Sequence, residues 1–426
     1  MPFPRLYLVR QKFPDRRLAD VPGETRRQLD ASPFASRLQP GARIAIGVGS
    51  RGITNLPVIV REVARWFLDH GARPFLFPAM GSHGAATAAG QAEVLAKYGI
   101  TEATMGCPVV SQLEVVSLGK TADGIEAFMD KAAFDSDGVM LIGRVKWHTD
   151  FAGRIESGLF KMMAIGLGKF AGARRYHCYA YKLGLEHVIT SVGRQVLASG
   201  KIIGGLAIME DERHNTAKLD AVPVEVMEQR EAENLALVKT WMPRVPADLD
   251  FLILDEMGKN ISGAGMDTRI INRGVFGEYN PWPDTPRFHR IFVRDLTDLS
   301  YGSAVGMGMA DMVPQRLVDK IDWTPTAINC LTSNVLASLR TPAHFPNDRE
   351  CLERVIPTVG KFDPLEITFG WIQNTLELEY VALSENLRAE IDRNPQVEIV
   401  DGPRDFEFDA DGNLVSPFVP AHAGAH

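Results

Sequence analysis

Short apolar runs of strand length alternate with amphipathic stretches of helix length in the first part of this chain. Residues 43–49 and 73–78 are apolar runs typical of buried strands. Each run precedes a stretch with apolar residues at helical spacing, residues 57–71 and 88–99, and each stretch ends on a glycine. Because strands joined by helices in this order form parallel sheets with right-handed connections, the alternation predicts an α/β fold with a mostly parallel sheet flanked by helices.

The length of 426 residues exceeds the size at which one hydrophobic core stops growing, so two domains are expected. The strand pattern restarts at residues 250–255, after a proline-containing break at residues 242–246. We therefore predict an N-terminal cofactor-binding and catalytic α/β domain at residues 1–245 and a C-terminal α/β domain at residues 246–400. Residues 401–426 are expected to form a tail that packs back on the first domain. The active site is expected in the cleft between the two domains.

Composition excludes several classes of function. The net charge of -7 leaves no broad basic surface, which argues against nucleic acid and anionic membranes as partners. No apolar run approaches the roughly 18 residues that a membrane span needs, and charges interrupt the N-terminal segment where a secretory signal would be apolar. Four cysteines without CxxC spacing indicate a reducing compartment. These features predict a cytoplasmic protein that acts on a small molecule.

The turn after the first predicted strand has the sequence GVGSRG at residues 47–52, which fits the dinucleotide-binding pattern G-x-G-x-x-G. That pattern also requires an acid at the end of the next strand to hold a ribose hydroxyl. Here the next strand is followed by Ala79 and Met80, which argues against a nicotinamide cofactor. The turn is better interpreted as displaying Arg51, whose planar guanidinium suits a substrate carboxylate. Alternatively, Arg51 forms a surface salt bridge.

Two histidines follow predicted strands whose carboxyl ends should reach the same sheet edge. His83 lies between glycine neighbours that let a substrate approach closely. His148 lies five residues beyond Gly143, which ends the apolar run at residues 139–142. Imidazoles are suited to proton transfer near neutral pH, although a lone histidine is more often structural. Together with Arg51, the two histidines predict a pair of acid/base groups around one anionic substrate.

More polar residues follow within the same glycine-rich stretch. Lys161 and His177 are sixteen residues apart, which is not a helical metal-binding spacing, so any shared site requires the chain to fold back. Alternatively, Lys161 extends past its apolar neighbours to solvent, and His177 pairs with the adjacent tyrosine. Arg174 and Arg175 stand beside glycines, where they either are solvated or hold the phosphate of a cofactor.

Taken in this order, the residues resemble the nickel-pincer lactate racemase (LarA-like) family. The resemblance covers most of the first predicted domain and is weaker in the second. It rests on five features in sequence, namely Arg51, the Gly-Ser-His loop at residues 81–83, His148 leading into Ala152-Gly153, Lys161 and His177.

The resemblance implies a role for each of these residues. Lys161 would tether a nickel-pincer nucleotide, a pyridinium-3,5-bisthiocarboxylic-type mononucleotide, and His177 would be the protein ligand to its nickel. His83 and His148 would be the paired acid/base residues, and Arg51 would bind the substrate carboxylate. The implied activity is racemisation or epimerisation at C2 of a 2-hydroxy acid. Cofactor-maturation proteins would then be partners, and the oligomeric state stays open.

Physical chemistry agrees with this assignment. The C2–H bond of a 2-hydroxy acid is too weakly acidic for an imidazole alone, whereas a hydride acceptor allows one histidine to take the hydroxyl proton. Return of the hydride from the other face requires a second histidine. Nickel with soft sulfur donors and one imidazole suits a planar site that leaves one face open to substrate.

The chain also departs from the family pattern. Val48 stands where the family has an acid, and residues 156–160 replace a Gly-Gly pair before the lysine. The family's Tyr-x-x-x-Lys pair is replaced by GKNISGAGMD at residues 258–267, where Lys259 or Asn260 would contact substrate or phosphate. These differences predict a substrate other than lactate, either a larger 2-hydroxy acid or a sugar acid.

Three alternatives stay open on the sequence. Lys169, also among glycines, is a second candidate for the tether. A zinc- or iron-dependent lyase or hydrolase would use His83, His148 and His177 as metal ligands. A catalytically silent protein with this fold would bind a small anion without turning it over.

Overall fold

The computed structural model describes residues 2–49 and 52–418. The chain divides into two compact units. One, called here the central unit, is the continuous segment Asp15–Met242. The other, called the composite unit, combines Met1–Pro14 with Pro243–His426. Among the described residues, no helix has the length and apolar character that crossing a membrane requires.

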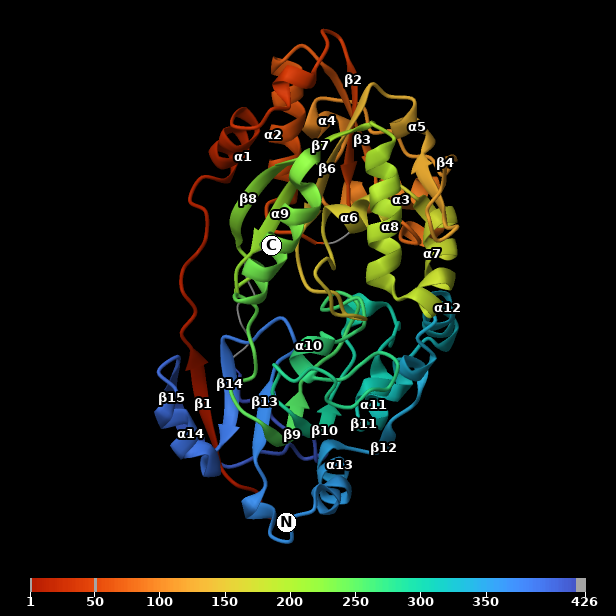
Figure 1. The fold of residues 1–426 in the computed structure, drawn as a ribbon. Coiled ribbons are helices and arrows are strands. Elements are labelled where there is room, and N and C mark those ends of the chain that lie inside the picture. The colour runs from red at the N-terminus through yellow and green to blue at the C-terminus, as the bar shows by residue number, and fades with distance from the viewer. Residues whose placement is uncertain (1, 50–51, 419–426) are drawn as a thin grey trace. The chain divides into compact units, whose positions relative to one another are not determined.

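The central unit is built on a five-stranded sheet in the order β3-β2-β6-β7-β8 (Figure 1). Its first four strands are mutually parallel, and β8 runs antiparallel to β7. This confirms the predicted mostly parallel sheet. The strands are β2 (Arg43–Val48), β3 (Arg73–Pro78), β6 (Gly138–Arg144), β7 (Ile202–Glu210) and β8 (Thr216–Pro223), and a separate hairpin consists of β4 (Val115–Lys120) and β5 (Glu126–Asp130).

Helices and helical turns connect these strands. The α-helices of the central unit are α1 (Val21–Asp30), α2 (Leu56–Asp69), α3 (Ala88–Lys97), α4 (Glu102–Met105), α5 (Lys131–Phe134), α6 (Leu159–Lys161), α7 (Lys169–Leu183), α8 (Leu185–Ala198) and α9 (Met227–Lys239). Its 3-10 turns are η1 (Ala35–Arg37), η2 (Gly84–Ala86) and η4 (Val224–Val226), and η3 (Met162–Gly166) is a π-helical turn.

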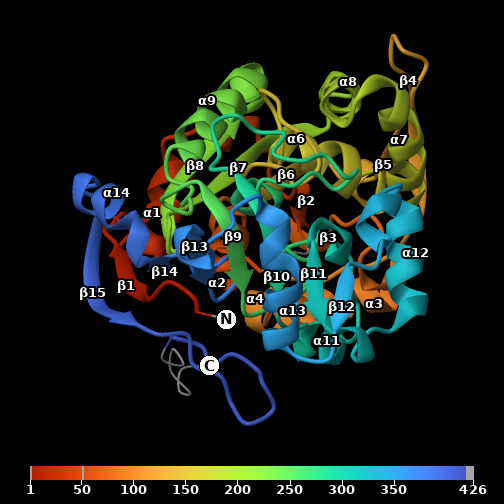
Figure 2. The same ribbon diagram turned by 90° about the horizontal axis from the view of Figure 1, so that it is seen from below.

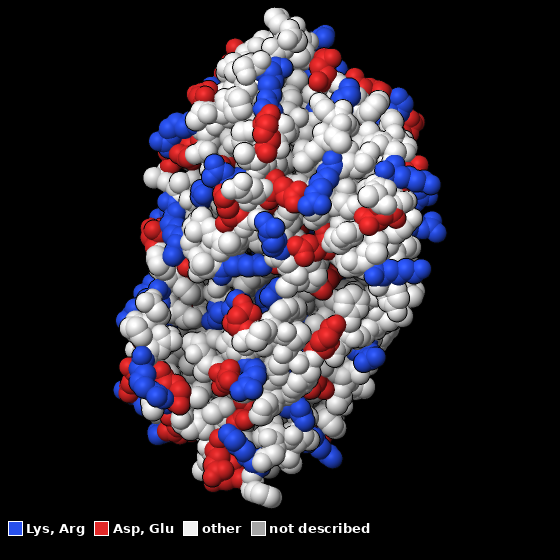
Figure 3. Space-filling model, viewed as in Figure 1, with Lys and Arg blue, Asp and Glu red and all other residues white. Residues whose placement is uncertain are grey.

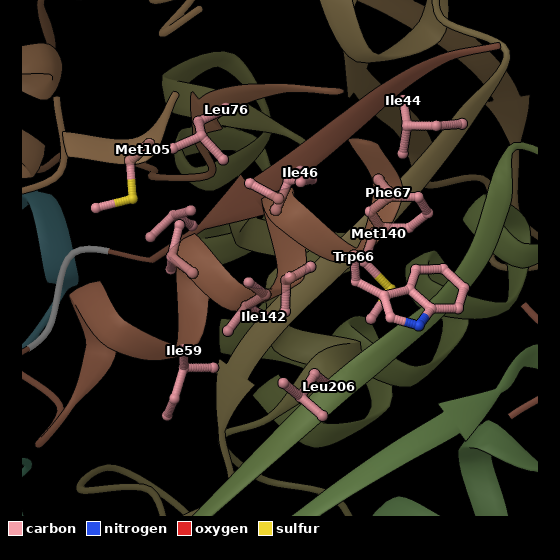
Figure 4. Packing of buried hydrophobic residues seen from close by; sticks show 14 of the residues in the cluster. Ile44, Ile46, Ile59, Trp66, Phe67, Leu76, Met105, Met140, Ile142 and Leu206 are labelled. Atoms are coloured by element: carbon pink, nitrogen blue, oxygen red, sulfur yellow. The ribbon is translucent and has the colours of Figure 1, made fainter. Parts of the chain in front are cut away.

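One face of the central sheet packs against α2. The alternating residues Ile44 and Ile46 of β2 lie on this face and meet Trp66 and Phe67 of the helix in one buried cluster (Figure 4). Each large apolar side chain buried in this way contributes about 1.5–3 kcal/mol. The period of two in the strand and the helical spacing in α2 both direct apolar side chains to this interface, as the sequence predicts.

The other face of the sheet carries α6 and α8, and glycines allow their close approach. A side chain at Gly205 of β7 would place its Cβ 2.7 Å from Leu159 of α6. A side chain at Gly193 of α8 would place its Cβ 2.5 Å from Phe160. Real Cβ atoms do not come this close, so glycine at both positions is required for α6 to lie between the sheet and α8.

The connections of the sheet diverge at the pair β2 and β6. Strand β2 leads through α2 to β3 on one side, whereas β6 leads through α7 and α8 to β7 on the other. Open α/β sheets bind ligands at the carboxyl ends of strands where the connections diverge in this way. The carboxyl ends of β2 and β6 are therefore the position where a site is expected.

The composite unit contains an eight-stranded sheet in the order β12-β11-β10-β9-β13-β14-β1-β15. Strands β12 to β13 in this order are parallel, and β14, β1 and β15 are antiparallel to their neighbours. The strands are β1 (Leu6–Gln11), β9 (Leu249–Leu254), β10 (Phe288–Val293), β11 (Met312–Pro314), β12 (Ala343–Phe345), β13 (Phe369–Ile372), β14 (Tyr380–Ser384) and β15 (Val397–Arg404).

Short helices flank this second sheet (Figure 2). The α-helices are α10 (Thr268–Ile271), α11 (Gln315–Asp319), α12 (Trp323–Ser333), α13 (Asp348–Val355) and α14 (Arg388–Arg393). The 3-10 turns are η5 (Asp298–Ser300), η6 (Met307–Met309), η7 (Leu336–Leu339), η8 (Ile356–Val359), η9 (Pro364–Glu366) and η10 (Glu385–Leu387).

Both chain termini differ from the predicted domain ranges. Strand β1 pairs with β14 and β15 of the composite unit, so the first fourteen residues do not belong with the rest of the range 1–245. In the tail after residue 401, Leu414 and Phe418 belong to the core of the same composite unit, whereas the prediction assigned the tail to the first domain. Pairing between strands so far apart in the chain leaves no local periodicity from which it could be predicted.

The surface carries both signs of charge. On the face shown in Figure 3, Lys and Arg side chains are interspersed with Asp and Glu side chains. Ion pairs such as Arg194–Glu228 and Arg37–Glu225 are part of this pattern.

Replacement of Val9 by Asp tests the placement of β1. Val9 is fully buried between Val381 of β14 and Ile399 of β15, and burying a charge there costs several kcal/mol. We expect limited proteolysis of the variant to cut within residues 243–418 while residues 15–242 stay protected. Val400→Asp, at a half-exposed position of β15, is the control and should resist like the wild type. Unchanged resistance of the Val9 variant would contradict the pairing.

Candidate active site

The π-helical turn η3 lies against the carboxyl ends of the two strands at which the sheet connections diverge. A Cβ at Gly49, just after β2, would lie 3.4 Å from the sulfur of Met162. A Cβ at Gly143, near the end of β6, would lie 3.1 Å from Cγ of the same methionine. Met162 directly follows Lys161, so this lysine stands at the edge where a ligand site is expected.

The turn after β2 is fixed by β6 and β7. Arg144 donates to the backbone oxygen of Gly52 and pairs with Glu210 at 2.5 Å. The second oxygen of Glu210 accepts a hydrogen bond from the backbone nitrogen of Thr54 at 2.9 Å. Arg51 itself lies outside the described residues, so its predicted role stays a prediction.

The loop that carries His83 packs on the same segment. A Cβ at Gly81 would lie 3.0 Å from Ile165 of η3 and 3.0 Å from Ala173 of α7. His83 follows two residues later and is exposed. The loop after β3 and the stretch that bears Lys161 and His177 are therefore neighbours at one edge of the central sheet.

The loop that carries His148 is held by a buried carboxylate. Glu156 is fully buried and accepts hydrogen bonds from the backbone nitrogens of His148 at 2.5 Å and Gly153 at 3.0 Å. The amine of Lys239 on α9 lies 2.5 Å from the same carboxylate and neutralises it. Through these hydrogen bonds Glu156 holds His148 and Gly153 of the loop together. Because Glu156 belongs to the short insertion at residues 156–160, that insertion has a structural role.

The ring of His148 has a fixed orientation. Its Nδ1 accepts a hydrogen bond from the backbone nitrogen of Asp150 at 3.0 Å. The ring also stacks on Phe151, with centroids 4.6 Å apart. Because Nδ1 is an acceptor in this geometry, the neutral ring carries its proton on Nε2.

Asp150 lies within electrostatic reach of three of the predicted site residues. Burial raises the pKa of its carboxyl group, and the charge of His148 opposes this most strongly. A hydrogen bond from Thr149 and the charges of Lys161 and His177 add to that effect. The net pKa of Asp150 lies below its ordinary value, so the carboxylate is ionised at neutral pH.

His177 responds to the same neighbours. Burial lowers the pKa of its imidazole, Asp150 raises it and the charge of Lys161 lowers it further. The net shift is downward from 6.5, so the imidazole is neutral at neutral pH. Lys161 and His177 are therefore close enough to interact electrostatically. Their shared role in one site stays a prediction.

The segment that bears Lys161 begins on a second buried carboxyl group. Glu231 of α9 is 1% exposed and accepts a hydrogen bond from the backbone nitrogen of Phe160 at 2.9 Å. A Cβ at Gly158 would lie 2.5 Å from this carboxyl group, which explains the glycine. Burial raises the pKa of Glu231 to about 8, although the hydrogen bonds from Phe160 and Leu159 oppose that shift.

A third carboxylate, on α8, binds the backbone of the same loop between His148 and Lys161. Glu186 accepts hydrogen bonds from the backbone nitrogens of Arg154 at 2.6 Å and Ile155 at 3.3 Å. A Cβ at Gly153 would lie 2.1 Å from it, so this glycine is also required by close approach.

Lys169 is placed away from the predicted tether position. Its amine is fully buried and donates to the backbone oxygen of Pro78 at 2.7 Å and to the side chain of Gln91 at 2.6 Å. Asp130 lies 3.7 Å away as its counter-charge. These contacts do not favour the alternative in which Lys169 holds the cofactor.

The remaining predicted residues are distributed differently. Arg175 pairs with Glu126 and lies over the ring of Phe128, both on β5. Arg174 is exposed on α7. Lys259 belongs to the composite unit, where its amine donates to the backbone oxygen of Gly263 at 2.9 Å within its own loop. The predicted contacts of these three residues with cofactor or substrate stay predictions.

Metal ligation by protein side chains alone was one predicted alternative. Within residues 2–49 and 52–418, no three His, Cys, Asp or Glu side chains gather closely enough to hold one metal ion. The alternative of a zinc or iron site built from His83, His148 and His177 therefore gains no support from the described side chains.

Sequence reasoning missed Asp150, Glu156 and Glu231. Asp150 stands two residues after His148, and this short spacing is a signal that could have drawn attention to it. Nothing in the sequence distinguishes Glu156 or Glu231 from exposed acids, because their burial depends on the packing of α9 against the loop.

Comparison with known proteins identifies the fold. No family model matches the chain, and no curated protein matches its sequence. The lactate racemase apoprotein from Thermoanaerobacterium thermosaccharolyticum aligns with a TM-score of 0.51 and 12% identity, over 87% of this chain and 99% of that one. A structural-genomics protein from Thermotoga maritima aligns with a TM-score of 0.48 and 12% identity, over 74% and 80%. The first likeness shows that this chain shares the two-domain α/β fold of the racemase apoprotein.

Replacing Glu231 by Gln tests the buried carboxyl group under the Lys161 segment. The pKa of Glu231 is about 8 in the folded protein, against an ordinary value of 4.5. The contribution of this group to the free energy of unfolding of the wild type is therefore complete below pH 4.5 and declines as the pH rises to about 8. Gln keeps one acceptor for Phe160 but does not titrate. We therefore expect the Tm of Glu231→Gln, relative to wild type, to rise between pH 5 and pH 8.

The matched control is Glu93→Gln at an exposed position of α3, paired with Lys97. Its Tm relative to wild type should not show this rise. A Tm difference between Glu231→Gln and wild type that is constant over the same pH range would mean that Glu231 is ionised in the folded protein.

Proposed function

We propose that this protein is a racemase or epimerase that inverts C2 of a 2-hydroxy acid. The observation that carries the proposal is that η3, next to Lys161, packs on the carboxyl ends of β2 and β6 and on the loop before His83, while Asp150 lies 3.9 Å from the ring of His148. The likeness of the fold to the lactate racemase apoprotein supports it. The departures from that family in sequence favour a larger 2-hydroxy acid or a sugar acid as substrate.

The residues fit a lysine-tethered nickel-pincer nucleotide. The charge of Lys161 lowers the pKa of His177, so an amine for attachment and an imidazole for metal ligation are within electrostatic reach of each other. The lowered pKa of His177 keeps its imidazole neutral, which is the form that ligates a metal. We propose Lys161 as the tether and His177 as the protein ligand. When bound, such a cofactor supplies a reversible acceptor for the hydride on C2.

His148 and His83 would move the hydroxyl proton of the substrate. As the charged imidazolium, the ring of His148 can give a proton from Nε2 to the oxygen on C2 of a keto acid, which leaves the ring neutral. The carboxylate of Asp150, 3.9 Å from Nδ1, favours the charged ring when His148 takes the proton in the reverse direction. His83, exposed on the loop after β3, is proposed to serve the opposite face of the substrate.

Substrate orientation would depend on the turn after β2. Arg51 is proposed to bind the carboxylate of the substrate through its two parallel N–H groups. Gly52 and Thr54, which follow it in the chain, are held by Arg144 and Glu210 of β6 and β7. A fixed anchor for the carboxylate brings C2 to one position for both directions of reaction.

Intact mass spectrometry tests the tether. Protein co-expressed with cofactor-maturation proteins should carry a mass adduct of the nucleotide, and Lys161→Ala should carry none. Lys182→Ala, at an exposed position of α7, is the control and should keep the adduct. An adduct on Lys161→Ala would remove this residue as the tether, and stoichiometric zinc in the protein expressed without maturation proteins would favour the lyase alternative.

A single enantiomer of a 2-hydroxy acid, labelled with deuterium on C2, tests the reaction. We expect both enantiomers to form with the label retained, because a hydride carried on the enzyme is shielded from water. His83→Gln and His148→Gln should each lower the rate by about 100-fold or more. His70→Gln, at the end of α2, should leave it unchanged. Loss of the label to water would indicate removal of a proton and contradict the hydride route.

A further inference from the structure

The turn that follows His83 has an unusual backbone conformation. Gly84, Ala85 and Ala86 have φ angles of 63°, 54° and 54°. Left-handed backbone is strained for an alanine because its Cβ crowds the following carbonyl oxygen, so two consecutive alanines in this region need external contacts to persist. This strained turn directly follows His83, the proposed proton-transfer residue, so the contacts that stabilise the turn also affect the position of His83.

Gln91 on α3 supplies the contacts. Its side chain is fully buried, and its amide nitrogen donates to the backbone oxygens of Gly81 at 3.0 Å and Met80 at 3.3 Å. The backbone oxygen of His83 lies 3.4 Å from the same nitrogen. One amide group therefore binds carbonyl groups of residues 80, 81 and 83, the segment that leads into the turn.

Lys169 determines which way this amide faces. An amide presents an oxygen on one side and a nitrogen on the other, and the two orientations have the same shape. The amine of Lys169 has donors only, and it lies 2.6 Å from Oε1 of Gln91. The oxygen must therefore face Lys169, which leaves the N–H donors of Gln91 for the loop that carries His83.

Lys169 occupies its position at a cost. Its φ of 54° is one that glycine adopts without strain, and burial lowers the pKa of its amine to about 8. Asp130 is the buried counter-charge, and the backbone oxygen of Pro78 is a further acceptor. A glycine at this position would avoid both the backbone strain and the burial of a charged amine. The lysine side chain must therefore make a contribution to the structure that glycine cannot make.

We infer that Lys169 and Gln91 form a positioning pair that fixes the turn after His83 relative to α7, the helix that also bears His177. The inference rests on the proposed function in one respect, because the role of His83 in proton transfer is taken from it. Lys169 is the first residue of α7, and Gln91 reaches the loop after β3. The pair thus connects the element of one proton-transfer residue with the element of the metal ligand.

Gln91→Glu is the decisive variant. A carboxylate still accepts from Lys169, so the buried charge keeps a partner, but the donors toward the loop are lost. Removing such hydrogen bonds should raise hydrogen–deuterium exchange at the amides of Ala86 and Thr87 by about tenfold. Turnover of the labelled 2-hydroxy acid should fall in kcat, with KM within about twofold and the cofactor adduct retained.

Lys169→Met combined with Asp130→Asn tests the other half of the pair without leaving a buried charge. It should raise exchange at the same amides, and adding Gln91→Met should raise it no further, since Lys169 acts through Gln91. Gln195→Glu is the matched control, because Gln195 also donates its amide to a backbone oxygen, that of Leu118, away from this loop. It should change neither measurement near His83.

The outcomes separate the two proposals. Unchanged exchange in Gln91→Glu, or increased exchange with unchanged kcat, would overturn the positioning pair. Absence of turnover in loaded wild-type protein would overturn the proposed function. In that case, increased exchange in Gln91→Glu but not in Gln195→Glu would still support the pair as the element that fixes the turn.

Discussion

The candidate site depends on carboxyl groups, two of them buried, that accept hydrogen bonds from backbone N–H groups of loops. A loop beyond the end of a strand has donors that no neighbouring strand satisfies, and burying them unpaired costs free energy. Here Glu156, Glu186 and Glu231 accept hydrogen bonds from the segment between His148 and Lys161. The loop therefore has a defined shape although it contains little regular structure.

Two of these carboxyl groups are buried by different means. Glu156 keeps its charge beside the amine of Lys239, so it is buried as an ion pair. Glu231 has a pKa raised to about 8, so it is buried as a neutral acid that can donate as well as accept. Both solutions come from α9, which is the last helix of the central unit. Helix α9 contributes no residue to the proposed chemistry. It nevertheless sets the geometry of the loop between His148 and Lys161, which does contribute.

Much of the central unit follows from its sequence, because its strands and helices carry local signals. The strand at residues 73–78 is predicted to the residue, and the loops that carry His83 and His148 follow β3 and β6 as expected. Burial of single polar residues could not be predicted in the same way. Lys169 and Gln91 are residue types that usually lie on the exposed face of a helix, and only the structure shows that both are fully buried and hydrogen-bonded to each other. The composite unit was harder for a related reason, since its sheet depends on strands distant in sequence.

The position of β1 has a consequence for the order of events during synthesis. Leu6–Gln11 is synthesised well before its partners Tyr380–Ser384 and Val397–Arg404, because the chain is made from its N-terminal side. The continuous segment Asp15–Met242 can complete its sheet in the meantime. The first strand must wait, with both of its hydrogen-bonding edges open, while more than three hundred residues are added. An unpaired strand edge can pair with other chains and so cause aggregation. This fold therefore requires that the segment of β1 be kept from such pairing until its partner strands have been synthesised.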